Sequence, residues 1–97
     1  MCDETLTRQV TVRNSNGLHA RPADLFSQQA RRFESKIEVV KEGARVDGKS
    51  ILDLFTLAAV QGTVLTLEAT GPDAQAAIEA LAKLIEVDLA NEEIIDH

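Results

Sequence analysis

One short segment of the sequence combines a nucleophile, a cation and a helix start. It spans residues 16–23 and reads N-G-L-H-A-R-P-A. Pro22 suits the first turn of a helix, where its missing N–H costs nothing, so it predicts that a helix begins close to His19. The unpaired N–H groups of that turn, together with Arg21, disfavour the imidazolium form of His19. A neutral imidazole with a free lone pair is a nucleophile.

The same surroundings suit a phosphate. A phosphoryl group on the His19 ring would face backbone N–H groups and the Arg21 guanidinium, as expected at a phosphate site. Helix-end effects of this kind are worth roughly 0.3–1 kcal/mol when exposed, which suits a carrier that must release its phosphate. The residues alone also allow a simpler interpretation, in which His19 only caps the helix and Arg21 is a solvated charge.

Other chemistries are poorly supported. A metal site needs three or four ligands, and the second histidine, His97, is the last residue of the chain. A serine hydrolase would need a G-x-S-x-G element, which the sequence lacks. The single cysteine, Cys2, lies beside the N-terminus, and we interpret it as a spectator. We therefore expect neither a metal nor a cofactor.

Composition narrows the class of protein. The chain has 97 residues, with 10 Lys and Arg against 16 Asp and Glu, for a formal charge of −6. An acidic chain lacks the excess of Lys and Arg that binds the phosphates of nucleic acid, so we expect no nucleic-acid partner. One cysteine forms no internal disulfide, and no apolar run approaches the ~20 residues that span a bilayer. We expect a cytoplasmic protein with no membrane partner, folded as a single domain over residues 1–97, with a core at about 5–89 and a frayed tail at 90–97.

The elements that must position His19 follow one another without linkers. Alternating or β-branched segments predict strands at residues 6–12, 36–41, 44–47 and 64–69. Apolar stripes predict helices at residues 20–33, at 50–57, and from the turn at 71–73 to about 89. The order βαββαβα predicts an α+β fold, an open-faced β-sandwich in which helices cover one face of a four-stranded, mainly antiparallel sheet. Such a fold does not by itself decide function.

The helix at 50–57 carries a second signal. Its apolar residues cover most of the helix circumference, so some of them should be exposed and form a docking surface. These residues are Ile51, Leu52, Leu54, Phe55 and Leu57. Ser50 and Asp53 match the S/T-x-x-D/E pattern, which predicts that Ser50 caps this helix.

Residues 17–23, G-L-H-A-R-P-A, resemble the active-site signature of HPr, the histidine phosphocarrier of the bacterial phosphoenolpyruvate:sugar phosphotransferase system. Residues 48–52, G-K-S-I-L, resemble the second signature of that family, around its regulatory serine. Residues 61–63 and Gly71 also fit, and the spacing is free of insertions from about Val10 to Leu89.

The resemblance implies a function. His19 would accept phosphate from phosphorylated enzyme I and pass it to enzyme II A components of sugar permeases. Arg21 would stabilise the phosphoryl group, while Gly17 and Pro22 would support the helix start. Such a protein is a phosphorylated substrate of enzymes rather than an autonomous catalyst. Ser50 would be a regulatory site for HPr kinase/phosphorylase.

The expected docking face shows two departures from the family. Partners of HPr present acidic surfaces, yet Asp24 and Asp53 stand where uncharged or basic residues are usual. We expect basic side chains to cluster near His19 and to compensate for these two carboxylates. Gln28 would add a polar side chain to this cluster. The expected cations are Arg21, Arg31 and Lys49. The residues assigned to docking are Ala20, Asp24, Ile51, Leu52 and Phe55.

Two alternatives remain open. One is a regulatory HPr paralogue, such as the nitrogen-related branch, that delivers phosphate to regulators rather than to sugar uptake. The other is a ferredoxin-like ligand-binding module in which His19 is only a cap. In each case we expect a monomer.

Overall fold

The computed structural model describes residues 5–14, 17–18 and 20–89. Its elements follow the predicted order βαββαβα. They are β1 (Thr5–Thr11), α1 (Ala20–Ala30), β2 (Lys36–Lys41), β3 (Ala44–Asp47), α2 (Ile51–Thr56), β4 (Val64–Thr70), α3 (Ala74–Lys83) and a π-helical turn η1 (Leu84–Asp88). His19 and the tail at 90–97 lie outside the described residues, as do Cys2 and His97.

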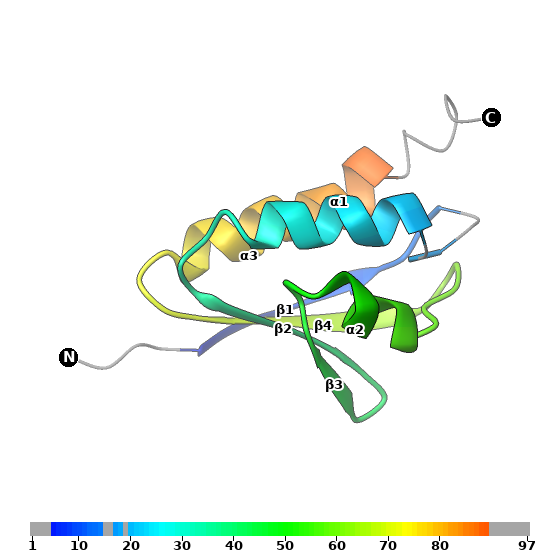
Figure 1. Ribbon diagram of the computed structural model, residues 1–97, viewed down its shortest axis with the longest axis horizontal. Helices are drawn as coiled ribbons and strands as arrows, with labels where there is room; N and C mark the ends of the chain where they lie inside the picture. The colour runs from blue at the N-terminus through cyan, green and yellow to red at the C-terminus, as the bar shows by residue number, and fades with distance from the viewer. Residues whose placement is uncertain (1–4, 15–16, 19, 90–97) are drawn as a thin grey trace.

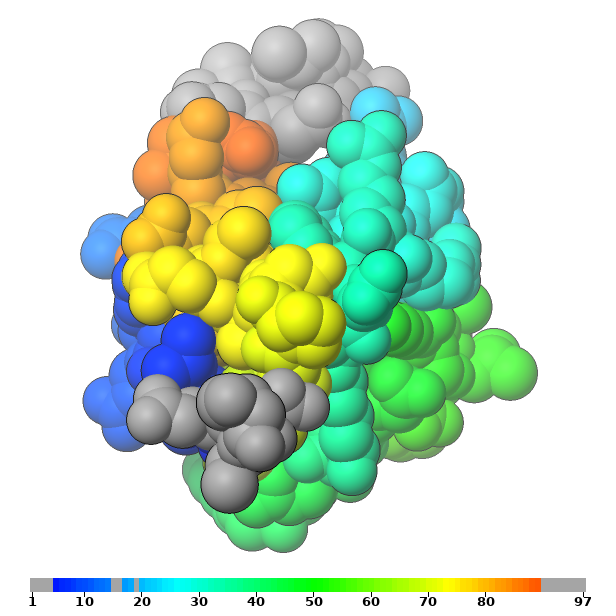
Figure 2. Space-filling model, turned by 90° about the vertical axis from the view of Figure 1, so that its left-hand side faces the viewer, coloured from blue at the N-terminus to red at the C-terminus, as the bar shows by residue number. Residues whose placement is uncertain are grey.

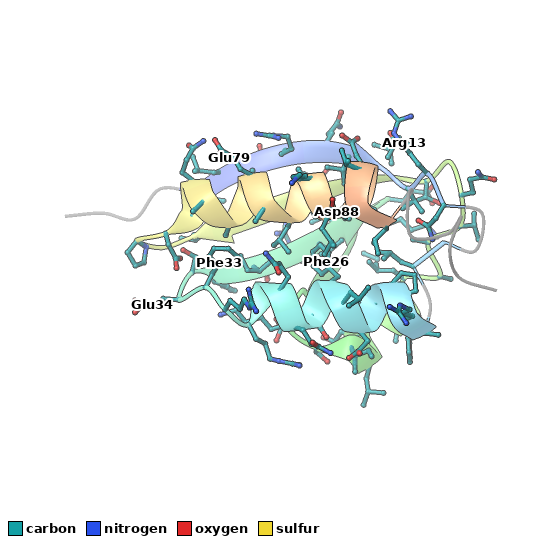
Figure 3. All side chains as sticks on the ribbon, turned by 90° about the horizontal axis from the view of Figure 1, so that it is seen from above. Arg13, Phe26, Phe33, Glu34, Glu79 and Asp88 are labelled. Carbon is teal, nitrogen blue, oxygen red and sulfur yellow. The ribbon has the colours of Figure 1, made fainter. Side chains whose placement is uncertain are left out.

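The four strands form one sheet in the order β1-β4-β2-β3, and each neighbouring pair is antiparallel. Helices α1 and α3 lie side by side over one face of this sheet, and α2 lies beside α1 (Figure 1). Seen from above, α1 (cyan) and α3 (yellow) lie next to each other over the sheet (Figure 3). The predicted α+β open-faced sandwich is therefore confirmed.

Alternation along the strands decides which face is buried. In β4, Leu65, Leu67 and Ala69 are fully buried beneath the helices. Helix α1 contributes Ala23 and Phe26, whose side chains are also inaccessible to solvent. Burying these two apolar surfaces against each other is the main stabilising contribution to such a two-layer fold.

The uncovered face of the sheet is polar and carries a charged row. Glu38 of β2 lies directly opposite Glu68 of β4 and Asp47 of β3. Like charges in such positions repel, but the Arg45 guanidinium contacts both glutamates. The bonds to Glu68 and then to Glu38 raise the pKa of Arg45 above its ordinary value.

The hairpin between β2 and β3 closes with a tight turn. Its two central residues, Glu42 and Gly43, have φ values of +49° and +88°. Two positive φ values suit a type I′ turn, whose twist matches the twist of the flanking strands.

The structure corrects the end of the first helix. The predicted helix ran to Phe33, but α1 ends at Ala30, so Arg31 and Arg32 follow the helix instead of lying in its last turn. The bonding changes there from i−4 to i−3, because Arg32 N donates to Gln29 O and Phe33 N to Ala30 O. These shorter-range bonds close the helix and turn the chain toward β2.

The last helix also differs from the single regular helix that the sequence predicted up to about residue 89. Beyond Lys83 the chain forms a π-helical turn, in which Leu89 N donates to Leu84 O five residues earlier. From this turn, Glu86 Oε2 accepts a hydrogen bond from Thr11 N at 2.9 Å. Glu86 therefore satisfies a backbone donor on the outer edge of β1.

No helix within the described residues is long and apolar enough to cross a membrane.

Candidate functional site

The segment that the sequence predicted to be reactive lies at the start of α1. The helix begins at Ala20, and Pro22 is its third residue, so the first-turn position predicted for Pro22 is confirmed. The first turn contains no acidic residue, which leaves the positive end of the helix dipole uncompensated there. Ala20 has φ +36°, an uncommon conformation for a residue with a Cβ. His19 precedes Ala20 in the sequence but lies outside the described residues.

Gly17 fixes the approach of the chain to this helix. Its φ is +71°, and a Cβ added there would lie 2.2 Å from Ala59 O and 2.9 Å from Val60 Cα. The next residue, Leu18, is buried and donates its N–H to Ala59 O at 2.8 Å. Only glycine fits at position 17, because any side chain would displace the backbone that holds Leu18.

A second loop, residues 57–63, acts as a platform for residues 12–14 and 17–18. Val12 N donates to Thr63 O, and Gly62 N donates back to Val12 O. Gln61 Nε2 donates to Arg13 O at 3.0 Å. The platform loop is itself anchored, because Lys41 Nζ donates to Leu57 O at 2.9 Å. Backbone bonds between the two loops thus set the position from which the chain enters α1.

Part of this platform could not be predicted from the sequence, for a physical reason. Ala59 acts through its carbonyl oxygen, and no residue type signals a backbone acceptor. Val60 beside it is 64% exposed and lies against Gly17, so it adds an apolar side chain near the site. The fit of residues 61–63 to the family pattern was the available signal.

The charges near α1 differ from the expected cluster. Arg21 is exposed in the first turn of α1, whereas Arg31 follows Ala30 at the other end of the helix. Ten residues at 1.5 Å each separate them by about 15 Å along the axis. Arg31 Nη1 donates to Lys49 O, and Lys49 Nζ donates to Phe33 O. The prediction that Arg31 and Lys49 gather with Arg21 is therefore wrong.

Asp24 and Gln28 form a pair on α1. Gln28 Nε2 donates to Asp24 Oδ2 at 2.9 Å, one turn further along the helix. Asp24 is half-buried, while Gln28 is exposed. The hydrogen bond holds the Asp24 carboxylate toward the middle of α1 instead of toward its first turn.

The predicted cap of α2 is confirmed. Asp53 N donates to Ser50 Oγ at 3.2 Å, and Ser50 has the extended backbone typical of an N-cap. Asp53 does not complete a reciprocal capping box, because its Oδ2 accepts from Asp47 N at 3.3 Å. The structure therefore explains Ser50 as a capping residue, and its regulatory role stays a prediction.

The expected exposure on α2 is also found. Leu52 is 70% exposed and Phe55 is 42% exposed, whereas Ile51 is half-buried and packs against the core. Helices α1 and α2 pack against each other (Figure 1), so the two exposed side chains lie on a helix that neighbours α1.

Metal chemistry finds no support in the described part of the chain. Across residues 5–14, 17–18 and 20–89, no group of three or more His, Cys, Asp or Glu side chains could hold a metal ion.

The open-faced α+β fold and the histidine that precedes α1 in the sequence agree with a phosphocarrier domain. The family model described as "PTS HPr component phosphorylation site" matches residues 6–87. The chain therefore belongs to the HPr family of the phosphotransferase system.

Similar proteins agree with this membership. The HPr-like protein Crh of Halalkalibacterium halodurans is 48% identical over 79 residues, which cover 81% of this chain and 94% of the relative. The phosphocarrier protein HPr of Neisseria meningitidis serogroup A is 45% identical over 80 residues, covering 82% and 90%. The crystal structure of HPr from Bacillus anthracis has a TM-score of 0.82 at 41% identity, covering 84% of this chain and 98% of that one.

Proposed function

We propose that this chain is a phosphocarrier that takes a phosphoryl group from phosphorylated enzyme I onto His19 and passes it to enzyme II A components. The observation that carries the proposal is the match of a phosphorylation-site family over residues 6–87, which contain the G-L-H-A-R-P-A segment. When the protein accepts the group, a ring nitrogen of neutral His19 forms a bond to phosphorus while the donor's bond to phosphorus breaks. The reverse sequence delivers the group to the acceptor.

The geometry around position 19 supports this role. A helix N-terminus without a first-turn carboxylate stabilises a phosphate and disfavours imidazolium. Arg21 in that turn is exposed, so its guanidinium supplies a second positive group for the phosphoryl oxygens. Leu52 and Phe55 supply exposed apolar area for docking enzyme I and the A components.

A direct test uses phosphoenolpyruvate and enzyme I. The protein should gain an acid-labile mass of roughly 80 Da, the mass of one phosphoryl group, and His19→Ala should not. Arg21→Ala keeps the acceptor and should gain the mass more slowly, because it removes a positive group from the phosphate. A gain that survives His19→Ala, or no gain with several enzyme I homologues, would contradict the proposal.

A regulatory paralogue is a second candidate. Two observations favour it: the 48% identity to a protein named HPr-like Crh, and the carboxylates of Asp24 and Asp53 on the surface expected to dock acidic partners. Capture experiments with the phosphorylated protein separate the two candidates. Recovery of enzyme II A components supports the sugar branch, and recovery of regulators without them supports the paralogue.

Ser50 has a test of its own. Phosphorylation by HPr kinase/phosphorylase with ATP should give an acid-stable phosphate that Ser50→Ala lacks. Asp47 and Asp53 lie at the same turn, so the new charge would add to two carboxylates and weaken the cap. Absence of the acid-stable phosphate would leave Ser50 with the capping role alone.

A further inference from the structure

Asn14 is a buried polar residue whose bonding is only half satisfied. It is 3% exposed, and its Nδ2 donates to Gly17 O at 2.7 Å. Gly17 N donates to Asn14 O at 3.1 Å, so two hydrogen bonds join Asn14 and Gly17. Among the buried side-chain nitrogen and oxygen atoms of the described residues, Asn14 Oδ1 is left without a hydrogen-bond partner.

An unpaired buried acceptor lowers the stability of the folded state, because the group loses water and gains nothing. A small apolar residue at position 14 would avoid that loss. The amide is therefore poorly explained by stability alone. What it uniquely provides is a donor to the Gly17 carbonyl, one residue before Leu18 is fixed on Ala59 O.

We propose that Asn14 is a positioning residue for phosphoryl transfer. Its amide fixes the Gly17 peptide, which with the Leu18–Ala59 bond sets the backbone that leads into position 19. Correct placement of a nucleophile lowers the barrier by removing orientational freedom, and small displacements are costly. The proposal rests on His19 being the phosphoryl acceptor, which is the function proposed above.

The test compares Asn14→Ala with Ser27→Ala. Ser27 is also buried, and its Oγ donates to Asp24 O at 3.0 Å in the middle of α1, so its removal deletes a similar bond away from the loop. Two donors are used: phosphorylated enzyme I and phosphoramidate, a small molecule that needs no docking. In the second reaction the phosphorus–nitrogen bond of phosphoramidate breaks, ammonia leaves and the bond to His19 forms.

We expect Asn14→Ala to slow phosphorylation by both donors by about 10–100-fold. Its Tm should change by less than about 5 °C, since one bond is lost but the unpaired acceptor is also removed. Ser27→Ala should react at the wild-type rate. An unchanged rate in Asn14→Ala, or an equal loss in Ser27→Ala, overturns the proposal, as does a loss confined to enzyme I.

Two further outcomes are informative. If Asn14→Ala does not fold, Gln61→Ala serves instead, because Gln61 is exposed and its Nε2 holds the neighbouring Arg13 carbonyl. A slower rate with both donors then supports control by loop position, and an unchanged rate overturns it. If phosphoramidate labels His19 in the wild type but enzyme I does not, the proposed carrier function fails, and the phosphoramidate rates still decide the role of Asn14.

Discussion

The two ends of α1 are held in different ways. At the site end, residues 12–14 and 17–18 are joined to the platform loop 57–63 mainly by backbone bonds and by the close contact of Gly17 with Ala59 O. At the far end, residues 31–35 and 71–73 are joined by side chains. Asp73 Oδ2 accepts from Glu34 N, and its Oδ1 accepts from the N–H and the hydroxyl of Ser35. Figure 2 views this far end, with the yellow and cyan-green segments in contact.

The difference indicates that the two ends of α1 have different roles. At the site end most of the bonds join backbone atoms, so the conformation of this loop pair depends little on charged side chains. The far end uses a carboxylate as a structural clamp, and Arg31 and Lys49 add two more bonds near it. Figure 3 shows Arg13 at the site end and Phe33 and Glu34 at the far end. Changes at the site end should therefore affect transfer, and changes at the far end should affect stability.

The largest effect is expected for Gly17→Ala. The new Cβ would meet Ala59 O at 2.2 Å in a backbone with φ +71°, so the loop must move. We expect a cost of roughly 1–3 kcal/mol in unfolding free energy and a loss of about 100-fold or more in transfer rate. Urea unfolding and rapid-quench phosphorylation by enzyme I measure the two quantities.

Gly43→Ala is the matched control for that change. Gly43 also has a positive φ, +88°, but a Cβ there would meet nothing within 4 Å. It should show the conformational cost without the loss of transfer. Equal transfer losses in the two variants would contradict the role assigned to the Gly17 contact.

The next effect is expected at the far end. Asp73→Asn should lower the urea midpoint at pH 7 while leaving the transfer rate unchanged. The Ser35 hydroxyl, followed by the Glu34 N–H, lowers the pKa of Asp73 below its usual value. A lowered folded-state pKa stabilises the protein above the ordinary value of about 3.9, and this stabilisation is lost as the pH falls through the folded-state pKa.

The decisive measurement is the urea midpoint of both proteins over a range of pH. The difference in midpoint between wild type and Asp73→Asn should narrow as the pH falls below about 4. Asp88→Asn, at an exposed carboxylate of η1, is the control and should leave the midpoint nearly unchanged. A pH-independent difference, or a slower transfer rate in Asp73→Asn, would break the contrast between the two ends.

A smaller effect is expected for docking. Phe55→Ala removes an apolar side chain that is 42% exposed on α2 and should raise the KM for enzyme I by about 5–10-fold, typical of an interface residue worth about 1 kcal/mol or more. Val64→Ala, at a site 50% exposed at the start of β4, tests general loss of apolar surface. If both variants raise KM equally, the docking surface is not confined to α2.

The smallest effect is expected for Ser50→Ala. Losing the bond from Asp53 N to Ser50 Oγ should cost about 1 kcal/mol of unfolding free energy. Ser50→Asn keeps an N-cap acceptor and should retain most of the stability. A change in phosphoryl transfer in the unphosphorylated Ser50→Ala protein would show that α2 acts on the site end, which its capping role does not predict.

Patterns local in the sequence predicted most of the fold. Alternation located β2, β3 and β4 to within a residue, and Pro22 located the first turn of α1. The sequence predictions are wrong at the ends of helices, where different hydrogen-bonding patterns compete. The last turn of α1 closes with i−3 bonds after Ala30, and a π turn replaces regular helix after Lys83. Residue preferences for these alternatives differ too little to be read from the sequence.

The candidate site divides in a similar way. The sequence alone determined the reactive residue types, the helix start and the cap at Ser50, because each depends on neighbours within a few residues. Tertiary structure alone decided that Ala59 O supports Leu18 and that Asn14 is buried with an unpaired oxygen. These facts depend on how distant segments pack. Residue type carries almost no information about this packing, since a backbone carbonyl is the same acceptor in every residue.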